Sequence, residues 1–555
     1  MKLFAQTCET LSTESSSLQK VETIAQALKS IPNDQELGLF CLYLTGSVYP
    51  VSIQKTINVG KAWLRDAACM LLGISKEQWS EAYAAFGETG EVIESLLQRY
   101  EKLELNMGLD IATPGDKNNA ISLLVLAEYI ELLNENSKSS VKVLIIADLL
   151  SRLTPLEAKY AAKLLLQRMR IGVQEASVED GIAKAFDVDK KQVKHLNFYL
   201  GDIGEVAVRC KDKNFEDIEF RLFHPIKAML ASAEVDVEDI FKRMGDQVWA
   251  EYKYDGMRAH IHGEGGRIEI YTRDLKRVTD QFPEVVEHMK PLSLKMPFLV
   301  DGEIVPYKDG EIKAFADLQK RLGRKEKINE AARDNPTAYI AYDLLYLNRE
   351  TLFGLTLQER RNKLEETFGS DVMYSTKEVV SNSDAFLAFF RKSKEEGREG
   401  LLVKNPSSHY ESGKRGIHWL KYKQTLDPLD VVVLEAEFGE GKNAKYLSNY
   451  IFGVWNHDRT ELVPIGRVYS GIKEDELKHY TAYLPTIATE KTVKGYKLEP
   501  KEIFEVGFEN IQKSERYTSG YAVRFPRILR IRTGDKPLDE ISTIGDVEDG
   551  WRKLN

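Results

Sequence analysis

The sequence predicts a multidomain α+β protein with an all-helical N-terminal part, a mixed α+β middle part and a C-terminal β-barrel. The chain has 555 residues, enough for about three or four domains of ordinary size. After Pro225 the pattern changes from helical periodicity to short β-rich runs between polar turns. A second break near Pro428 precedes a series of closely spaced strand-like runs. Hydrophobic residues make up 43% and charged residues 29%, which excludes wholesale disorder.

The first third of the chain reads as helical. Thr154-Pro155-Leu156-Glu157 combines an N-cap, a proline at the first helical position and a capping-box glutamate. Apolar residues at helical spacing continue to Ile171, so Gly172 is predicted to end this helix, and a second helix is predicted to begin at Ser177. The acidic segment 211–220 reads as a linker, which places the helical domain at residues 1–218.

The middle part, residues 219–426, alternates β-rich runs with helical stretches. The runs QVWAEYKYDG, FLVDGEIVPYKDG and AYIAYDLLYLN are typical of strands, whereas LQERRNKLEETF is typical of a helix. The tail, residues 427–555, has the strand-like runs DVVVLEAEFGE, NYIFGVWNH and ELVPIGRVYSG at short spacing, interrupted by the helical EDELKHYTAYL. This spacing predicts a small β-barrel of the OB-fold type.

Composition limits the classes of function. The four cysteines share no spacing and the nine histidines form no HxxxH or HExxH pair, which argues against a disulfide framework and a zinc site. No apolar run reaches the ~18 residues that span a bilayer, and the N-terminus lacks the pattern of a signal peptide. We therefore expect an intracellular protein with no membrane partner. The net charge of −9 argues weakly against a nucleic-acid partner.

The segment EYKYDGMR carries the first candidate chemistry. Alternation along VWAEYKYD places Glu251 and Lys253 on the same face of a strand that ends at Asp255-Gly256. A lysine at a strand end, close to Arg258 and a metal ion, can act as a nucleophile. Taken alone, the pattern is weak and is more typical of a solvent-facing lysine beside an Asp-Gly hairpin turn.

Other short motifs follow in order along the chain: YTR at 271–273, DGE at 301–303, AYDLLY at 341–346, EGLLVK at 399–404, WLKYK at 419–423 and RFPRILRIR at 524–532. This series resembles the collinear motifs of the covalent nucleotidyltransferases, and most closely those of the ATP-dependent DNA ligases. The resemblance covers residues 223–536. The segment 154–186 is similar to the helical DNA-binding domain of archaeal and eukaryotic-type replicative ligases, and HPIKAMLA at 224–231 to the entry into their adenylation domain.

The resemblance implies a role for each motif residue. Lys253 would attack the α-phosphorus of ATP to form lysyl-AMP, Glu251 would accept the adenine amino group, and Tyr342 would stack on the base. Glu399 would bind Mg²⁺ (or Mn²⁺), and Glu303 would bind the ribose or the same metal. The alternative for Tyr342 is a packed core tyrosine, because buried strand aromatics are common, and the alternative for the two glutamates is a charge in a surface hairpin.

The basic motif residues are implied to contact phosphates. The α-phosphate, the adenylate phosphate or the 5′-phosphate of a nick would be contacted by Arg258, Arg273, Lys421 and Lys423, with Arg415 as a further candidate. The last motif, with Arg527 at its centre, would orient the β- and γ-phosphates through guanidinium–phosphate pairs. The remaining motif residues are Asp255, Gly256, Arg524, Arg530 and Lys536, and TGDKP around Lys536 departs from the commoner spacing.

The resemblance therefore implies a monomeric, ATP-dependent DNA ligase that seals nicked double-stranded DNA. Its OB domain would reorient about a hinge at Tyr422–Pro428. A prokaryotic source would place the protein in the cytoplasm and a eukaryotic source in the nucleus. Neither end of the chain shows a convincing clamp-binding peptide, so recruitment by a sliding clamp stays open.

Three alternatives stay open from the sequence: an RNA ligase or a capping-type guanylyltransferase, a non-catalytic DNA-binding clamp with the same fold, and, for the first 220 residues alone, a helical protein-interaction scaffold. The net charge does not exclude DNA, because the acidic excess lies in the first third and the other parts are nearly neutral. DNA contacts of the helical domain are expected from a local patch that includes Arg168 and Arg170.

Overall fold

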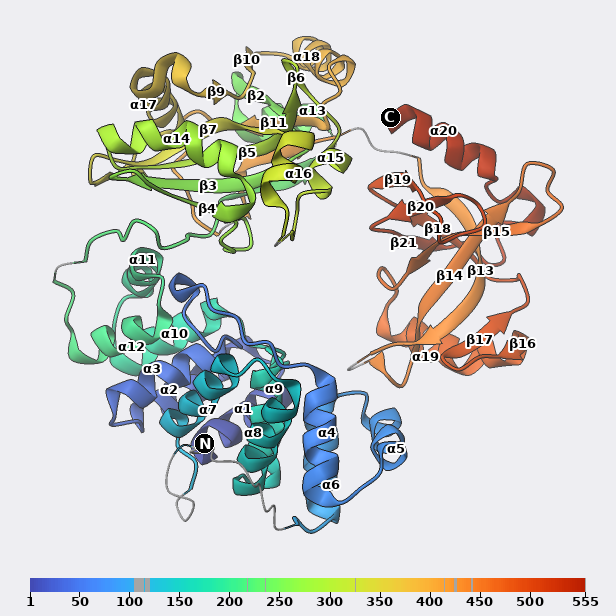
Figure 1. Cartoon of the computed structure of the whole chain (residues 1–555). Coiled ribbons are helices and arrows are strands. Elements are labelled where there is room, and N and C mark those ends of the chain that lie inside the picture. The colour runs from blue at the N-terminus through green and yellow to red at the C-terminus, as the bar shows by residue number, and fades with distance from the viewer. Residues whose placement is uncertain are drawn as a thin grey trace. The chain divides into compact units, whose positions relative to one another are not determined.

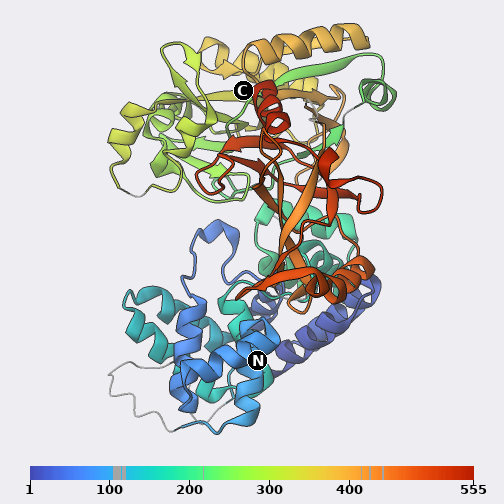
Figure 2. The same ribbon diagram turned by 90° about the vertical axis from the view of Figure 1, so that its right-hand side faces the viewer.

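The computed structural model describes residues 1–103, 114, 120–216, 218–234, 236–324, 326–413, 415–423, 427–440 and 443–554. The chain divides into two compact units, which are described separately: Met1–Ser80 with Thr89–Lys423, and Glu81–Glu88 with Gln424–Asn555. Figure 1 labels the elements, and Figure 2 gives a second view. The predicted hinge and the boundary at 426 fall partly on residues 424–426, and the predicted linker includes residue 217, all outside the described residues.

The first part of the larger unit is helical, as predicted (Figure 1). Phe4 shows how its helices pack, because its ring lies edge-on to the rings of Phe40 at 5.5 Å and Tyr43 at 6.2 Å. The helices are α1 (Lys2–Thr13), α2 (Ser17–Lys29), α3 (Asp34–Leu44), α4 (Lys61–Leu72), α5 (Lys76–Phe86), α6 (Thr89–Arg99), α7 (Leu123–Glu135), α8 (Ser139–Arg152), α9 (Pro155–Leu165), α10 (Glu175–Phe186), α11 (Lys190–Leu200) and α12 (Ile203–Asp212). Only the first part of α5, up to Ser80, belongs to the larger unit.

Helix α9 begins where the sequence predicts. The Thr154 hydroxyl accepts from the backbone N–H of Glu157 at 3.4 Å, and the Glu157 carboxylate accepts from the backbone N–H of Thr154 at 3.0 Å. These two hydrogen bonds form the predicted capping box.

The predicted end of α9 is wrong, because the helix stops at Leu165 and not near Ile171. Gln167 and Arg170 take left-handed backbone conformations, with φ of 51° and 52°, which no helix can continue through. Lys20 Nζ then donates to the carbonyls of Ile171 and Gly172 at 2.9 and 3.0 Å. Helix α10 starts at Glu175 rather than at Ser177.

Two β-sheets form the middle part. The first has the strand order β1-β12-β11-β2-β10, and the second has the order β4-β3-β5-β7-β8, with β6 beside β5 and β9 beside β7. The strands are β1 (Leu230–Glu234), β2 (Val248–Lys253), β3 (Met257–Glu264), β4 (Arg267–Thr272), β5 (Phe298–Lys308), β6 (Glu311–Ile312), β7 (Thr337–Leu347), β8 (Glu350–Thr351), β9 (Met373–Tyr374), β10 (Lys377–Val380), β11 (Gly400–Lys404) and β12 (Arg415–Tyr422).

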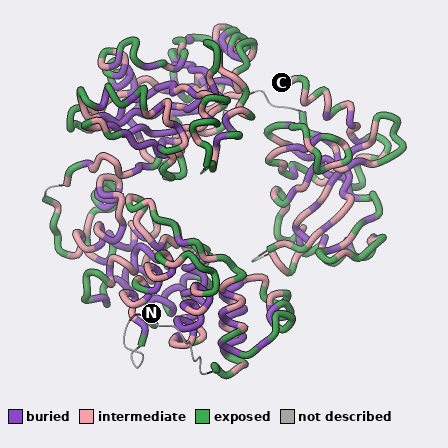
Figure 3. The backbone as a smooth tube through the Cα atoms, viewed as in Figure 1, coloured by how far each residue is buried: buried purple, intermediate pink, exposed green. Residues whose placement is uncertain are grey.

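Helices cover both sheets of this part. Helices α14 (Pro283–Lys295) and α17 (Leu357–Phe368) pack on the second sheet, while α13 (Val237–Met244) and α18 (Ser383–Glu395) pack on the first. Two shorter helices, α15 (Phe315–Gln319) and α16 (Ile328–Asp334), come after β6 in the chain. One buried cluster joins side chains of both sheets, including Trp249 and Trp419 from the first and Leu299 and Tyr342 from the second. Figure 3 shows buried backbone along these strands. Tyr342 is thus placed where the two sheets meet.

His262, on β3, is a fully buried imidazole in this core. Its Nδ1 accepts a hydrogen bond from the backbone N–H of Phe223 at 3.0 Å. Burial, followed by the positive charge of His260, His224 and Arg267, lowers the pKa of His262 well below 6.5. The unfolded chain therefore binds a proton below about pH 6.5 that the folded protein does not, and folding weakens as the pH falls below that value.

We expect His262→Gln, which keeps an acceptor for Phe223, to remove this part of the acid sensitivity. Between pH 8 and pH 5.5 the wild-type free energy of unfolding should fall by about 1.4 kcal/mol more than that of the variant. Urea titrations at the two pH values measure the difference. Parallel losses in both proteins would contradict the assignment to His262.

The second unit is rich in strands, as predicted, which completes the expected fold class (Figure 1). The long β13 pairs with β14 along one edge and with β17 and β18 along the other, in a seven-stranded sheet that also includes β15, β16 and β21. The elements are β13 (Leu429–Phe438), β14 (Leu447–Trp455), β15 (Leu462–Val468), α19 (Glu474–Tyr483), β16 (Ala488–Lys491), β17 (Gly495–Leu498), β18 (Ile503–Gly507), β19 (Asn510–Lys513), β20 (Tyr521–Arg524), β21 (Arg527–Ile531) and α20 (Ile544–Leu554).

The helix predicted from EDELKHYTAYL is α19. Throughout the described part of the chain, no helix combines the length and the apolar character needed to cross a membrane.

Candidate active site

Two lysines and one carboxylate meet at the ends of three neighbouring strands. Strand β11 lies between β2 and β12, with Gly400 opposite Lys253 and Leu401 opposite Tyr422. Glu399 directly precedes β11, and its N–H donates to the carbonyl of Lys253 at 2.9 Å. Its carboxylate pairs with the ammonium groups of both Lys253 and Lys423. The three side chains are each about one quarter exposed, so these charged groups are accessible to a ligand at the strand ends.

Gly400 allows this close approach because it has no side chain. A Cβ at this position would lie 2.3 Å from the carbonyl oxygen of Tyr422 and 3.3 Å from the Cα of Lys423. Contacts this short require a glycine. The same holds at Gly256, where a Cβ would lie 2.4 Å from the carbonyl oxygen of Ile304.

Arg258 and Glu303 face each other across the β3–β5 pair. Arg258 is held by Asp301, to whose two carboxylate oxygens its Nε and Nη2 donate at 3.0 and 2.6 Å. The Tyr410 hydroxyl donates to the same carboxylate at 2.9 Å. Burial alone would raise the pKa of Asp301, but Arg258 and then His260 hold it well below its usual range. The Arg258 guanidinium is therefore fixed beside Glu303.

The carboxyl group of Glu303 is electrostatically unusual. Burial raises its pKa to about 7, although the charges of Lys253 and Arg258 favour ionisation. A bound divalent cation would favour the ionised form of such a carboxyl. Together with Glu399, it offers two carboxylates, a donor set that suits Mg²⁺, which binds one or two acids and otherwise waters and phosphate oxygens.

Glu251 and Tyr342 both contact one buried cation, Lys404. Lys404 Nζ is 2.8 Å from Glu251 Oε2 and 4.5 Å from the centre of the Tyr342 ring. Glu251 is 1% exposed, and Tyr342 is 4% exposed. The Arg258 guanidinium carbon lies 5.5 Å from the centre of the same ring, so Tyr342 is close to two cations.

The remaining predicted site residues of the larger unit take no part in the contacts described above. Lys421 is half-buried on β12, with Leu402 and Ala233 as its register partners. Arg273 follows β4 and Asp255 follows β2, both exposed, and Arg415 is exposed at the far end of β12. Arg168 and Arg170 are exposed in the turn between α9 and α10.

The last motif lies in the second unit. Arg524 ends β20, and Arg527 begins β21 with its side chain exposed. Arg530 pairs with Glu505 at 3.2 Å, and Lys536 pairs with Asp430 at 3.3 Å.

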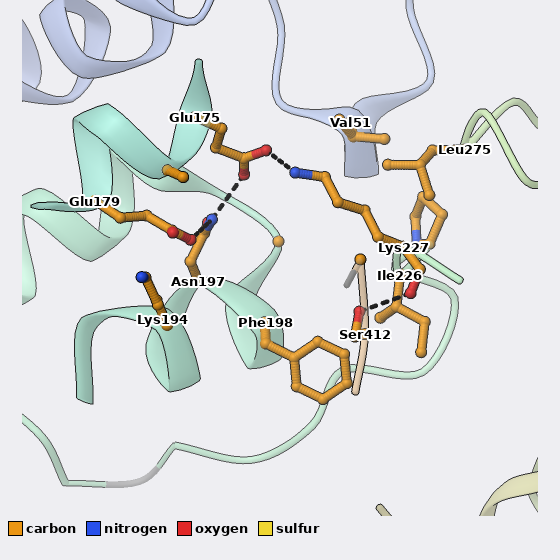
Figure 4. Close-up of a pocket in the computed structure, with 14 residues that line it drawn as sticks. Val51, Glu175, Glu179, Lys194, Asn197, Phe198, Ile226, Lys227, Leu275 and Ser412 are labelled. Carbon is orange, nitrogen blue, oxygen red and sulfur yellow. Dashed lines mark hydrogen bonds and ion pairs between the residues drawn. The ribbon is translucent and has the colours of Figure 1, made fainter. Parts of the chain in front are cut away.

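A separate pocket lies elsewhere in the larger unit (Figure 4). It has a volume of about 310 Å³ and is lined by α10 and α11 and by segments that include Lys227, Leu275 and Ser412. Lys227 spans it to pair with Glu175. None of the predicted site residues lines this pocket, so it is distinct from the centre at Lys253.

Comparison with known families assigns the three parts of the chain. The family model described as ATP dependent DNA ligase domain matches residues 228–423, the DNA ligase N terminus matches residues 1–183, and the ATP dependent DNA ligase C terminal region matches residues 443–535. The chain belongs to the ATP-dependent DNA ligase family.

Individual ligases match along nearly the whole chain. The DNA ligase of Archaeoglobus fulgidus is 33% identical over 554 residues, which cover 99% of this chain and 98% of that protein. The probable DNA ligase of Koribacter versatilis is 32% identical, covering 100% and 96%. The solved structure Pmar-Lig_PreS3 has a TM-score of 0.58 at 16% identity, covering 95% of this chain and 99% of that one. This last likeness shows the fold alone.

Several residues that contact the candidate site residues were not predicted from the sequence. They are Lys404 and Ser375, which contact Glu251, and Asp301 and Tyr410, which hold Arg258. Lys404 and Asp301 belong to the motifs EGLLVK and DGE, so their place in a motif could have identified them as site residues. Tyr410 and Ser375 lie outside every motif, and only the fold brings them to the site.

Proposed function

We propose that the protein seals nicks in double-stranded DNA with ATP. Lys253 attacks the α-phosphorus of ATP, and a phosphoramidate bond forms as pyrophosphate leaves. The AMP passes to the 5′-phosphate of the nick, which regenerates Lys253. The 3′-hydroxyl then attacks that phosphate and expels AMP as the phosphodiester forms. The observation that carries the proposal is the placement of Lys253 at a strand end beside Glu399 and Lys423.

The side chains around Lys253 divide the substrate contacts. Glu251 accepts from the adenine amino group, and Tyr342 provides the aromatic platform for the base. The phosphates are held by the cations of the motifs, because charge builds up on their oxygens during transfer. These cations are Arg258, Arg273, Lys421 and Lys423, with Arg415 as a further contact.

A divalent metal, Mg²⁺ or Mn²⁺, would neutralise charge on the transferring phosphate. Glu303 and Glu399 would hold it. Glu399 also pairs with the ammonium groups of both Lys253 and Lys423. This pairing keeps both cations close to the position where the α-phosphate reacts.

The domains take the boundaries 1–218, 219–426 and 427–555. The last domain supplies Arg527 to the β- and γ-phosphates of ATP in the first step, and it moves about a hinge at Tyr422–Pro428 in later steps. Arg524, Arg530 and Lys536 belong to the same basic motif, alongside Asp255 and Gly256 of the first motif.

The helical domain contacts the duplex, with Arg168 and Arg170 on phosphates of the DNA backbone. Both side chains are exposed in one turn and can reach a ligand. The protein acts as a monomer, in the cytoplasm of a prokaryote or the nucleus of a eukaryote, and recruitment by a sliding clamp is a separate question.

A nick-sealing assay with a panel of nucleotides tests the proposal. Purified protein with Mg²⁺ should join a labelled nick in duplex DNA with ATP, and should not join the matching nick in RNA. Sealing of RNA in preference to DNA would identify an RNA ligase. Adduct formation with GTP and not ATP would identify a capping-type enzyme, and no adduct with any nucleotide would leave a DNA-binding clamp.

Arg527→Ala is expected to slow formation of the enzyme–AMP adduct at least roughly tenfold more than sealing of a nick that already carries AMP, because one guanidinium–phosphate pair is lost only in the first step. Single-turnover rates of the two reactions provide the comparison. The exposed Arg516 of the same unit offers a control, as Arg516→Ala should leave adduct formation unchanged. Equal loss in both reactions would contradict a first-step role for Arg527.

A further inference from the structure

The two oxygens of the buried Glu251 carboxylate have unequal surroundings. Oε2 accepts from Lys404 Nζ at 2.8 Å and from the Ser375 hydroxyl at 2.9 Å. Oε1 is also buried, yet it has no hydrogen-bond partner within the described part of the chain. An unpaired buried acceptor is costly, and this one belongs to the residue assigned to the adenine amino group.

The direction of the Ser375 hydrogen bond is determined by its other neighbour. Arg361 Nη1 donates to the Ser375 hydroxyl oxygen at 2.8 Å, and Nη2 donates to the Ser375 carbonyl at 3.0 Å. A guanidinium group can only donate. The single hydroxyl proton of Ser375 must therefore point to Glu251, so Ser375 acts as a donor to Oε2 and cannot act as an acceptor there.

Lys404 is the second donor, and it is enclosed by rings. It is 0% exposed, and its Nζ lies 4.5 Å from the centre of the Tyr342 ring and 4.4 Å from that of Trp419. Ring faces attract the ammonium group but accept no strong hydrogen bond, so Glu251 is the carboxylate that balances its charge. The pair orients Glu251 relative to Tyr342, the platform for the base.

We propose that Ser375 and Lys404 are positioning residues that select adenine, because they occupy one oxygen of Glu251 and leave the other as an acceptor for the 6-amino group of the base. The inference rests on the proposed use of ATP. A purine without a 6-amino group would leave Oε1 without a hydrogen-bond donor. A 6-oxo purine would place a second acceptor, its 6-oxygen, next to Oε1. Sites with a buried group that requires a partner reject the analogue that lacks it.

The test compares ATP with purine riboside triphosphate, which differs only in lacking the 6-amino group. Rates of enzyme–AMP or enzyme–purine-nucleotide adduct formation give kcat and KM for each. The wild-type protein should prefer ATP about 100-fold in kcat/KM, the range expected for one hydrogen bond to a charged group. In Ser375→Ala and in Lys404→Met, this preference should fall to about tenfold or less, mainly through a higher KM for ATP.

Ser393→Ala is the matched control, since Ser393 is equally buried but donates only to the carbonyl of Phe390 in its own helix. It should keep the wild-type preference. Lys404→Met leaves a buried charge unpaired, so Ser375→Ala carries the test if that variant does not fold, as judged by its melting curve. A Ser375→Ala protein that loses the same factor with both nucleotides, or with neither, would overturn the inference. A wild-type protein that forms no adduct with ATP would overturn the proposed function as well.

Discussion

Replacing Lys253 by alanine is expected to abolish the enzyme–AMP adduct, with adduct formation at least roughly 10⁴-fold slower than in the wild type. The alanine side chain has no group that can form the phosphoramidate. Lys423 does not replace Lys253, because it follows a different strand, β12. Incubation with α-labelled ATP, followed by denaturing electrophoresis, measures the adduct. Sealing of an ordinary nick should be lost in parallel.

The exposed Lys308, at the end of β5, is a matched control for Lys253. Lys308→Ala should form the adduct at the wild-type rate. Persistence of a labelled, acid-labile adduct in Lys253→Ala would assign the nucleophile to another residue. Because the Lys253→Ala variant is unable to carry out only the first step, it should still seal a nick whose 5′-phosphate already carries AMP.

Replacing Arg360 by methionine is expected to lower the free energy of unfolding by about 3–5 kcal/mol. Arg360 and Asp343 are both 0% exposed, and two hydrogen bonds of 2.7 and 2.8 Å join them. Methionine fills much of the same volume but leaves the Asp343 carboxylate buried without a cation. Asp343 directly follows Tyr342 on β7, so the substitution should also weaken ATP binding.

Urea unfolding followed by tryptophan fluorescence measures the effect of Arg360→Met. Arg391→Met, at an exposed position of α18, should change the midpoint little. Adding Asp343→Asn to Arg360→Met removes the unpaired charge and should recover part of the loss. Equal midpoints for Arg360→Met and the wild type would show that the ion pair contributes no net stability.

The parts of the fold that depend on neighbouring residues could be predicted from the sequence. The capping box of Thr154 and Glu157 is a local pattern, and so is the alternation that places Glu251 and Lys253 on one face of β2. The end of α9 could not be predicted in this way. The left-handed backbone of Gln167 lets the N–H groups of Gln167 and Arg168 donate to the carbonyls of Leu164 and Lys163 at 2.8 and 2.9 Å, which ends the helix. Glycine is the residue that usually marks such an end, so a glutamine there gave no signal.

The surroundings of the site residues were harder to predict because they depend on residues far apart in the sequence. Motif order predicted which residues belong to the site, but it does not say how the strands pair. The pairing of β2 with β11 brings Lys404 to Glu251 across 153 residues. Ser375 reaches the same carboxylate from a segment with no motif, and its hydrogen bond depends in turn on Arg361 of α17. Such contacts follow from packing, which a single sequence does not display.

The absent side chain at Gly400 also affects how tolerant the protein is of mutation. Position 400 has no functional group, yet any larger residue would push β11 away from the carbonyl oxygen of Tyr422 and carry Glu399 with it. A saturation library would therefore score residue 400 as essential, alongside Lys253. A position in this region that tolerates no substitution can therefore be one where the strands leave no space for a side chain, as well as one whose side chain takes part in the reaction.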